Sequence, residues 1–437
     1  MSRIEKKVLI ITYYWPPSGG SGVQRWLKFV KYLPSFGYKP YVFTPENPAF
    51  SIRDESLNKD VPKEAEIIRF PIWEPYEIFF KLSGIFGRKK KSSTKPTALL
   101  GDDEKSFFQK ISIWIRGNFF IPDPRVFWVN PSVKFLSKFV SENNIQTIIT
   151  TGPPHSVHLI GLRLKKQNPS LRWLADFRDP WSEWGLLASL LVSNSIRKIH
   201  KRLEFEVLSN ADEVITITPF YVKQFEALAK RKVQLLTNGF DEDDFKNIIY
   251  KKSNVFLIRH VGIVNEKCDP GTFMEAVLEL MRTNEDFKSH ITIEFIGEVH
   301  TRFKAYVQSS KDLSSVVVFK GNIPHGQLIA QYGESSLLVL ILTGYKDAVG
   351  YMPGKLFEYL ATGLPILGVG PVEGDASVLL KETQAGEMID SADVSEIKKA
   401  LLANFKTWKN SDQPVVRRGK NELYSRRTIT GNLTTLI

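Results

Sequence analysis

The chain has 437 residues, 43% of them hydrophobic, which is enough for about two or three domains with cores of their own. Its 59 basic against 47 acidic side chains give a net charge of +12, which suits nucleic acid, an anionic membrane surface or a phosphorylated substrate. The single cysteine, Cys268, excludes an internal disulfide and suits a reducing compartment, and no run of about 18 apolar residues predicts a membrane-spanning helix.

Short apolar runs alternate with helical patterns through residues 1–240. Strands separated by helices predict a doubly wound parallel sheet, which makes this region a Rossmann-like domain. The runs predicted as strands are 8–12, 41–44, 66–70, 147–152, a run beginning at Arg172, 214–218 and 233–238.

The stretch YYWPPSGGSGVQRW follows the first predicted strand and leads into a helix. Its glycines, Gly19, Gly20 and Gly22, would let the backbone approach a phosphate near a helix N-terminus. The match to a dinucleotide fingerprint is poor, because Arg25 stands where the third glycine belongs. On these residues alone, a ligand-binding loop and a structural turn both remain open.

Between residues 71 and 128 the alternation is interrupted by an aromatic and basic insertion. The part from Ile78 to Gly101 contains no acidic residue and six lysines or arginines. Residues 77–100 could therefore lie on an anionic membrane surface. An ordinary loop insertion with a solvated basic run is the alternative. A nucleic-acid partner is not expected, because no RNA-binding motif accompanies these residues.

A polar, turn-rich stretch over residues 241–254 predicts a linker, and a second alternation of strands and helices follows over 255–405. We therefore predict a second Rossmann-like domain of the same type. The predicted arrangement has the two domains facing across a cleft, because ligands bind beyond the carboxyl ends of parallel strands. The basic tail, 406–437, is expected to pack back on the N-terminal domain.

The segment GYMPGKLFEYLATGLPILGVGP carries the strongest functional signal. A Pro-Gly turn precedes a helix with Lys355 and Glu358 three residues apart, directly after an apolar strand. An ammonium group beside helix N–H groups suits a pyrophosphate, and a carboxylate one turn later suits a ribose diol. The alternative is an ordinary surface ion pair.

With these motifs the chain resembles family 4 glycosyltransferases of the GT-B fold, from the branch that builds bacterial surface polysaccharides. The resemblance extends over YYWPPSGGSGVQRW, ITTGPPHSVH, DFRDPW, ADEVITIT, LLTNGFD, HVGIVNEKCDP, PGKLFEYLATGLPILGVGP and EGDAS. It implies a hexosyltransferase-type enzyme that moves a sugar from a nucleoside diphosphate sugar to a saccharide or lipid-linked saccharide acceptor, with retention of configuration. It implies no metal and no other cofactor.

The resemblance also assigns residues. Gly19, Gly20, Gly22, Lys355 and Glu358 would bind the donor. The family's usual basic residue after HVG falls on Cys268, so either Lys267 takes its role or Lys355 carries the charge nearly alone, and we expect Lys267.

Two residues of the N-terminal domain are catalytic candidates, His155 in TTGPPHSVH and Asp179 in DFRDPW. A helix-capping or buried histidine and a structural salt bridge are the respective alternatives. Many members of the family have two glutamates eight residues apart, and Glu358 corresponds to the second of them. The position of the first is Gly350 in this chain, and this branch of the family uses the PGK turn instead.

Two other functions are compatible with the same fold. One is a sugar-nucleotide epimerase, and the other is a catalytically inactive assembly protein docked on a membrane. For the enzyme, the expected location is cytoplasmic, peripheral at the inner face of the membrane.

Overall fold

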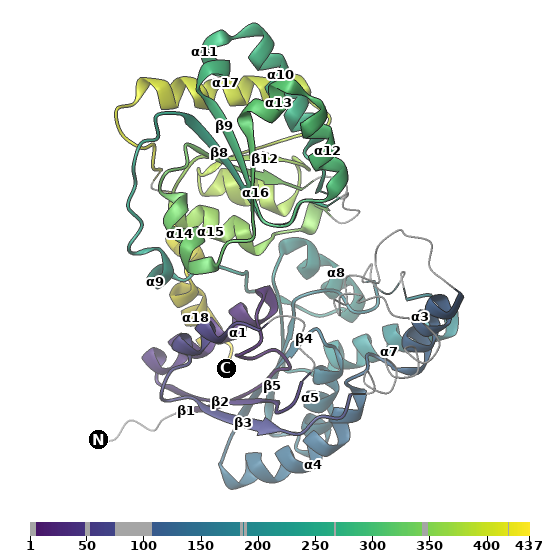
Figure 1. Cartoon of the computed structure of the whole chain (residues 1–437). Coiled ribbons are helices and arrows are strands. Elements are labelled where there is room, and N and C mark those ends of the chain that lie inside the picture. The colour runs from purple at the N-terminus through teal and green to yellow at the C-terminus, as the bar shows by residue number, and fades with distance from the viewer. Residues whose placement is uncertain are drawn as a thin grey trace. The chain divides into compact units, whose positions relative to one another are not determined.

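The computed structural model describes residues 6–48, 53–74, 107–183, 187, 190–265, 268–342, 348–417 and 419–437. The chain divides into two compact units (Figure 1). The first unit comprises Met1–Ile217, Tyr221–Thr237 and Thr430–Ile437, and the second comprises Thr218–Phe220 and Asn238–Ile429. Residues 241–254 and most of the tail therefore belong to the second unit, and the last eight residues belong to the first.

The first unit is built on a seven-stranded sheet whose strands are all parallel, in the order β3-β2-β1-β4-β5-β6-β7. From β1 to β3 each new strand is added on one side of the sheet, and from β4 to β7 on the other side. The order of the strands therefore reverses between β1 and β4, as in doubly wound folds. The strands are β1 (Lys6–Ile11), β2 (Tyr38–Pro45), β3 (Glu66–Phe70), β4 (Thr147–Gly152), β5 (Arg172–Phe177), β6 (Glu213–Thr216) and β7 (Gln234–Leu235).

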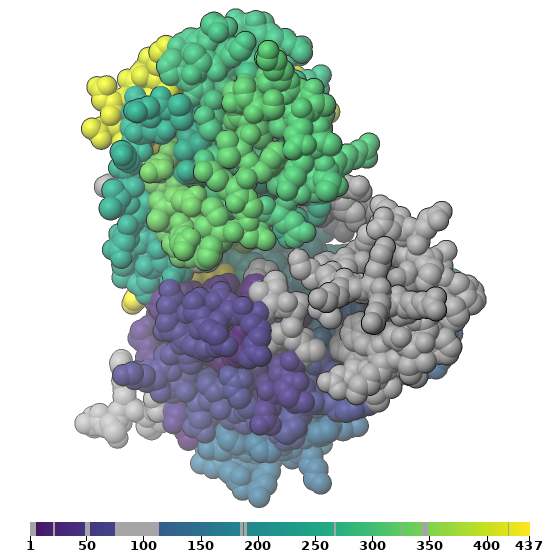
Figure 2. Space-filling view, viewed as in Figure 1, coloured from purple at the N-terminus to yellow at the C-terminus, as the bar shows by residue number. Residues whose placement is uncertain are grey.

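Helices cover this sheet, and one buried apolar cluster, which includes Leu9, Phe43, Ile148 and Trp173, joins sheet and helices. Residues near the N-terminus, purple in Figure 2, form much of the surface of the first unit on the face shown there. The helices are α1 (Ser21–Tyr32), α3 (Phe107–Phe119), α4 (Val126–Glu142), α5 (Ser156–Gln167), α7 (Asn194–Asn210) and α8 (Pro219–Ala229), with 3-10 turns η1 (Leu33–Phe36) and η2 (Glu55–Asp60).

The second unit repeats the topology with six parallel strands in the order β10-β9-β8-β11-β12-β13. Here the order reverses between β8 and β11. The strands are β8 (Phe256–Val261), β9 (Ile291–Ile296), β10 (Val317–Gly321), β11 (Leu337–Ile341), β12 (Ile366–Val369) and β13 (Gly386–Ile389). The structure thus confirms the predicted fold class of two Rossmann-like parallel-sheet domains.

Two buried apolar clusters hold the helices of the second unit on its sheet. Helix α18 begins in the second unit and ends in the first. The helices are α9 (Glu242–Phe245), α10 (Gly271–Thr283), α11 (Glu285–His290), α12 (Thr301–Ser309), α13 (Lys311–Val316), α14 (His325–Tyr332), α15 (Gly354–Thr362), α16 (Asp375–Glu382), α17 (Val394–Asn410) and α18 (Arg426–Thr434), with 3-10 turns η5 (Ala348–Gly350) and η6 (Asn421–Tyr424).

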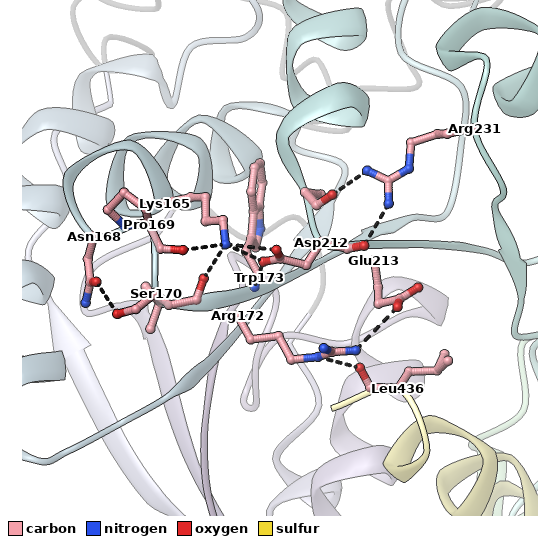
Figure 3. A network of polar contacts seen from close by, with 12 residues as sticks. Lys165, Asn168, Pro169, Ser170, Arg172, Trp173, Asp212, Glu213, Arg231 and Leu436 are labelled. Atoms are coloured by element: carbon pink, nitrogen blue, oxygen red, sulfur yellow. Dashed lines mark hydrogen bonds and ion pairs between the residues drawn. The ribbon is translucent and has the colours of Figure 1, made fainter.

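Polar side chains close the amino-terminal edge of β5 and β6 (Figure 3). The Lys165 ammonium donates to the carboxylate of Asp212 at 2.8 Å, and Arg172 pairs with Glu213 at 3.3 Å. Arg172 Nε also donates to the Leu436 carbonyl at 3.1 Å, which ties the end of the chain to this edge. These groups bind one another, so this edge of the first sheet is structural.

Candidate functional site

The reversal point of the second sheet lies between β8 and β11, and both strands end there close to the start of α15. β8 ends at Val261 and is followed by Gly262, whose φ of +117° requires a glycine. A side chain at position 262 would meet the Lys355 ammonium at 3.4 Å. No side chain caps α15 at Pro353, so its first N–H groups are not occupied by a cap. This is where an open parallel sheet binds its ligand.

Lys355 is held by a histidine and not by a carboxylate. Its Nζ lies 3.1 Å from Nε2 of the buried His260, and His260 Nδ1 lies 3.0 Å from the Val339 carbonyl oxygen. Because a carbonyl only accepts, Nδ1 carries the ring proton and Nε2 accepts from the ammonium. Burial lowers the pKa of Lys355 to about 8, since the charged form loses hydration there. Among the described residues, the Lys355 ammonium thus has a neutral partner and no carboxylate within ion-pair distance.

Glu358 is fixed one turn after Lys355. The hydroxyl of Tyr332, which is fully buried on α14, donates to Glu358 Oε2 at 3.1 Å. The neighbouring Tyr359 accepts from the Val261 N–H at 2.8 Å and so attaches α15 to the end of β8. Lys355 contacts His260 and forms no ion pair with Glu358, so the surface ion-pair alternative does not apply.

Two other predicted positions lie beside this site. Cys268 is buried, and its Sγ donates to the Ile341 carbonyl at 3.2 Å. Lys267, the expected second basic residue, lies outside the residues that the structure describes. Gly350 is buried against Phe220, where an added Cβ would approach the ring to 2.4 Å. A glutamate does not fit at position 350 without displacing that ring.

The glycine loop of the first unit is held by an arginine. Gly20 has φ of +93° and precedes α1, while Gly19 lies partly buried between β1 and α1. The Arg178 guanidinium, just after β5, donates to the carbonyls of Gly22 at 2.7 Å, Gly152 at 3.0 Å and Pro153 at 2.6 Å. It thereby links the loops that follow β1, β4 and β5 at the carboxyl edge of the first sheet.

Arg25, which breaks the dinucleotide fingerprint, forms a buried ion pair with Asp176 at 3.0 Å. Asp176 also accepts from Trp26 Nε1 at 2.6 Å and Thr151 Oγ1 at 2.9 Å. Arg25 donates further to the carbonyls of Leu236 and Thr237, both at 2.8 Å. Asp176 is fully buried and joins α1 to β4 and β5, which is a structural role.

His155 stands at the start of α5 but does not cap it. The capping side chain is Asp123, which accepts from the N–H and the hydroxyl of Ser156 at 2.9 and 2.8 Å. The His155 ring is buried and stacks on Trp181, with ring centroids 5.1 Å apart. Burial holds its pKa well below the usual value, so the ring is neutral near pH 7.

Asp179 follows β5 by two residues and is partly exposed. Burial raises its pKa above the usual carboxyl value, a perturbation found often in functional sites. The structure thus places both catalytic candidates, His155 and Asp179, in loops that leave the carboxyl edge of the first sheet. Among the described residues, no three or more His, Cys, Asp or Glu side chains are grouped to hold a metal ion.

The sequence reasoning did not identify His260 or Tyr332. Both belong to segments, FLIRHVG and HGQLIAQYG, whose pattern predicted only a strand and a helix. A signal in the sequence is that Arg259 and His260 interrupt an otherwise apolar strand shortly before Gly262. A surface pocket of about 430 Å³, lined by residues of α4 and α5 that include Lys134 and Arg163, is separate from these groups.

No protein-family model and no curated protein matches the chain. Solved structures do. A glycosyltransferase from Rickettsia africae matches with 14% identity and a TM-score of 0.60, covering 99% of this chain and 98% of its own. A TarM mutant of S. aureus, solved with fondaparinux, alpha-GlcNAc-glycerol and UDP, matches with 10% identity and a TM-score of 0.55, covering 99% of both chains.

A Listeria monocytogenes protein assigned as a UDP-N-acetylglucosamine 2-epimerase matches as well, with 10% identity, a TM-score of 0.52 and coverage of 98% and 95%. These matches establish the fold, which is the GT-B fold predicted from the sequence. Transferase and epimerase share it, so the choice between them depends on chemistry.

Proposed function

We propose that the chain is a glycosyltransferase that takes its sugar from a nucleoside diphosphate sugar. The observation that carries this proposal is the Lys355 ammonium at the reversal point of the second sheet, held at 3.1 Å by neutral His260 and followed by Glu358 one turn later. A cation with no neutralising partner among the described residues suits a diphosphate. The Glu358 carboxylate, fixed by Tyr332, suits the vicinal hydroxyls of a ribose.

The proposed reaction moves the sugar to a hydroxyl of a saccharide or lipid-linked saccharide, with retention of configuration. The C–O bond between sugar and diphosphate breaks, and the leaving diphosphate gains negative charge that Lys355 and the N–H groups at the start of α15 stabilise. The acceptor oxygen forms the new bond, and its proton passes to the departing phosphate. His155 is proposed to contact the donor sugar and Asp179 to position the acceptor.

A panel of nucleoside diphosphates and their sugars tests this function. Binding of one nucleotide raises the melting temperature by mass action, and that nucleotide's sugar is then incubated with saccharide acceptors. Glycosylated product supports the transferase. Epimerised donor in the absence of acceptor supports the epimerase, which the Listeria neighbour keeps as the second candidate. An inactive assembly protein would bind no member of the panel.

We also propose membership of family 4, a role in surface polysaccharide synthesis and a cytoplasmic location.

Nucleotide affinity is expected to depend on pH through Lys355. Its pKa of about 8 means that the ammonium loses its proton as the pH rises through this value, and an anionic ligand binds the protonated form. The dissociation constant of the nucleoside diphosphate should therefore be constant near pH 7 and rise above about pH 8. Calorimetry between pH 7 and 9.5 measures it.

The Lys355→Arg variant is the control, because an arginine stays charged over this range. A dissociation constant of the wild-type protein that is flat to pH 9.5 would contradict the assignment of Lys355 to the ligand.

We further propose that the first unit docks on an anionic membrane surface. Residues 77–100, on which this prediction rests, lie outside the described residues. Support comes from the aromatic side chains on both sides of that segment. Trp73, Trp114, Phe119 and Phe127 are exposed by 54%, 45%, 68% and 44%, and Trp73 contacts Phe127 with centroids 4.8 Å apart. No helix among the described residues is long and apolar enough to cross a bilayer.

Substituting Trp114 and Phe119 together by serine is expected to weaken binding to vesicles containing phosphatidylglycerol by about tenfold or more, since each buried aromatic side chain contributes roughly 1.5–3 kcal/mol. Flotation with and without the anionic lipid measures the effect. Tyr306→Ser, at an exposed aromatic of the second unit, is the matched control. Absence of salt-sensitive binding by the wild-type protein would refute the docking proposal.

A further inference from the structure

His260 bridges the two strands that part at the reversal point of the second sheet. β8 and β11 are paired at Ile258↔Leu337 and at Arg259↔Leu338, and His260 follows immediately. There the ring of His260 reaches the Val339 carbonyl of β11 at 3.0 Å. The backbone pairing of β8 and β11 ends at Arg259, and the side chain of His260 joins the two strands one residue further on. This contact lies next to the start of α15.

The opposite nitrogen of the same ring faces Lys355. Since Nδ1 carries the proton for Val339, Nε2 has a lone pair, and the ammonium donates to it at 3.1 Å. Burial and the adjacent Lys355 charge hold the pKa of His260 well below its usual value, so the ring stays neutral. A neutral acceptor orients an ammonium without cancelling its charge, whereas a carboxylate in the same place would neutralise it.

We propose that His260 is a positioning residue for diphosphate binding, which fixes the direction of the Lys355 ammonium and leaves its charge and its remaining N–H donors for phosphate oxygens. The inference rests on the proposed function and deepens it. It explains why a histidine, rather than an apolar residue, stands at this position of a fully buried strand. It also gives Gly262 a role, because the Lys355 side chain passes over this residue.

A purely structural histidine would tie β8 to β11 and would do nothing else. The two roles separate because the two ring nitrogens have different partners. His260→Asn keeps an amide near the Nδ1 position, where it can still donate to Val339, but it does not extend to Lys355. His260→Gln places its amide near the Nε2 position, where its oxygen can accept from Lys355, while the contact with Val339 is lost.

The test is a double-mutant cycle read by calorimetry with UDP, GDP, ADP and inorganic pyrophosphate. His260→Asn is expected to lower the affinity for the tightest-binding of these ligands by about fivefold or more, because the effects of His260 and Lys355 on binding are coupled. His260→Gln is expected to retain most of the affinity. In a Lys355→Met background, His260→Asn should have no further effect. Thermal unfolding of each variant shows that the fold is kept.

The inference is overturned if His260→Gln loses affinity while His260→Asn keeps it, or if His260→Asn weakens binding equally with and without Lys355. Its failure is distinct from failure of the proposed function. If Lys355→Met weakens diphosphate binding while both His260 variants bind as the wild type does, only the positioning role falls. If the wild-type protein binds none of the four ligands, the proposed function falls as well.

Discussion

Replacing Lys355 by methionine is expected to lower kcat/KM for the nucleotide sugar by about a hundredfold to a thousandfold, the range seen when one stabilising donor to a developing charge is removed. Part of this loss is weaker binding of the unreacted nucleotide sugar, because one charge-assisted hydrogen bond of about 1.5–3 kcal/mol is lost. This part raises KM. The remainder appears in kcat, because the diphosphate is more negative as the sugar leaves. Steady-state kinetics with the donor identified by the nucleotide panel separate the two contributions.

Methionine keeps the length and the apolar stem of Lys355, so packing against Gly262 is retained. Lys381→Met, at an exposed lysine in α16 of the same unit, is the matched control and should leave the kinetics unchanged. Kinetics of Lys355→Met equal to those of this control would remove Lys355 from the reaction.

Replacing Asp176 by alanine is expected to destabilise the first unit by about 3–5 kcal/mol, the usual cost of breaking a buried ion pair from one side. Arg25 is 1% exposed, and without Asp176 its guanidinium would remain buried without the carboxylate of this ion pair, because the carbonyls of Leu236 and Thr237 accept hydrogen bonds but carry no charge. Trp26 and Thr151 would lose their acceptor as well.

Urea unfolding followed by tryptophan fluorescence measures this loss, because Trp15, Trp26, Trp128, Trp173 and Trp181 are all buried in the first unit. The matched control is Glu142→Ala, which breaks the exposed pair with Lys138 and should cost less than about 1 kcal/mol. A loss for Asp176→Ala no larger than that of the control would show that the buried pair contributes little.

The fold followed from apolar runs because strands buried on both faces of a parallel sheet contain few polar residues. Elements without that signal were missed. Helix α4 carries Pro131 in its interior, where the ring usually ends a helix. The predicted strand 233–238 is only Gln234–Leu235, since the carbonyls of Leu236 and Thr237 bind Arg25 and not a neighbouring strand.

The candidate site was predictable where its residues are close in sequence. Lys355 and Glu358 share one helix, and a Pro-Gly turn and an apolar strand before them indicate their place at a sheet edge. His260 and Tyr332 lie 95 residues before Lys355 and 26 residues before Glu358, respectively, so only tertiary structure brings them together. Arg25 and Asp176 are likewise 151 residues apart.

The central claim is that the reversal point of the second sheet binds a nucleoside diphosphate through Lys355 and Glu358. A crystal structure with the diphosphate selected by the nucleotide panel tests it most directly. The account predicts phosphate oxygens within hydrogen-bond distance of Lys355 Nζ and ribose hydroxyls on the Glu358 carboxylate. A nucleotide bound elsewhere, with no phosphate oxygen on the Lys355 ammonium, would contradict it.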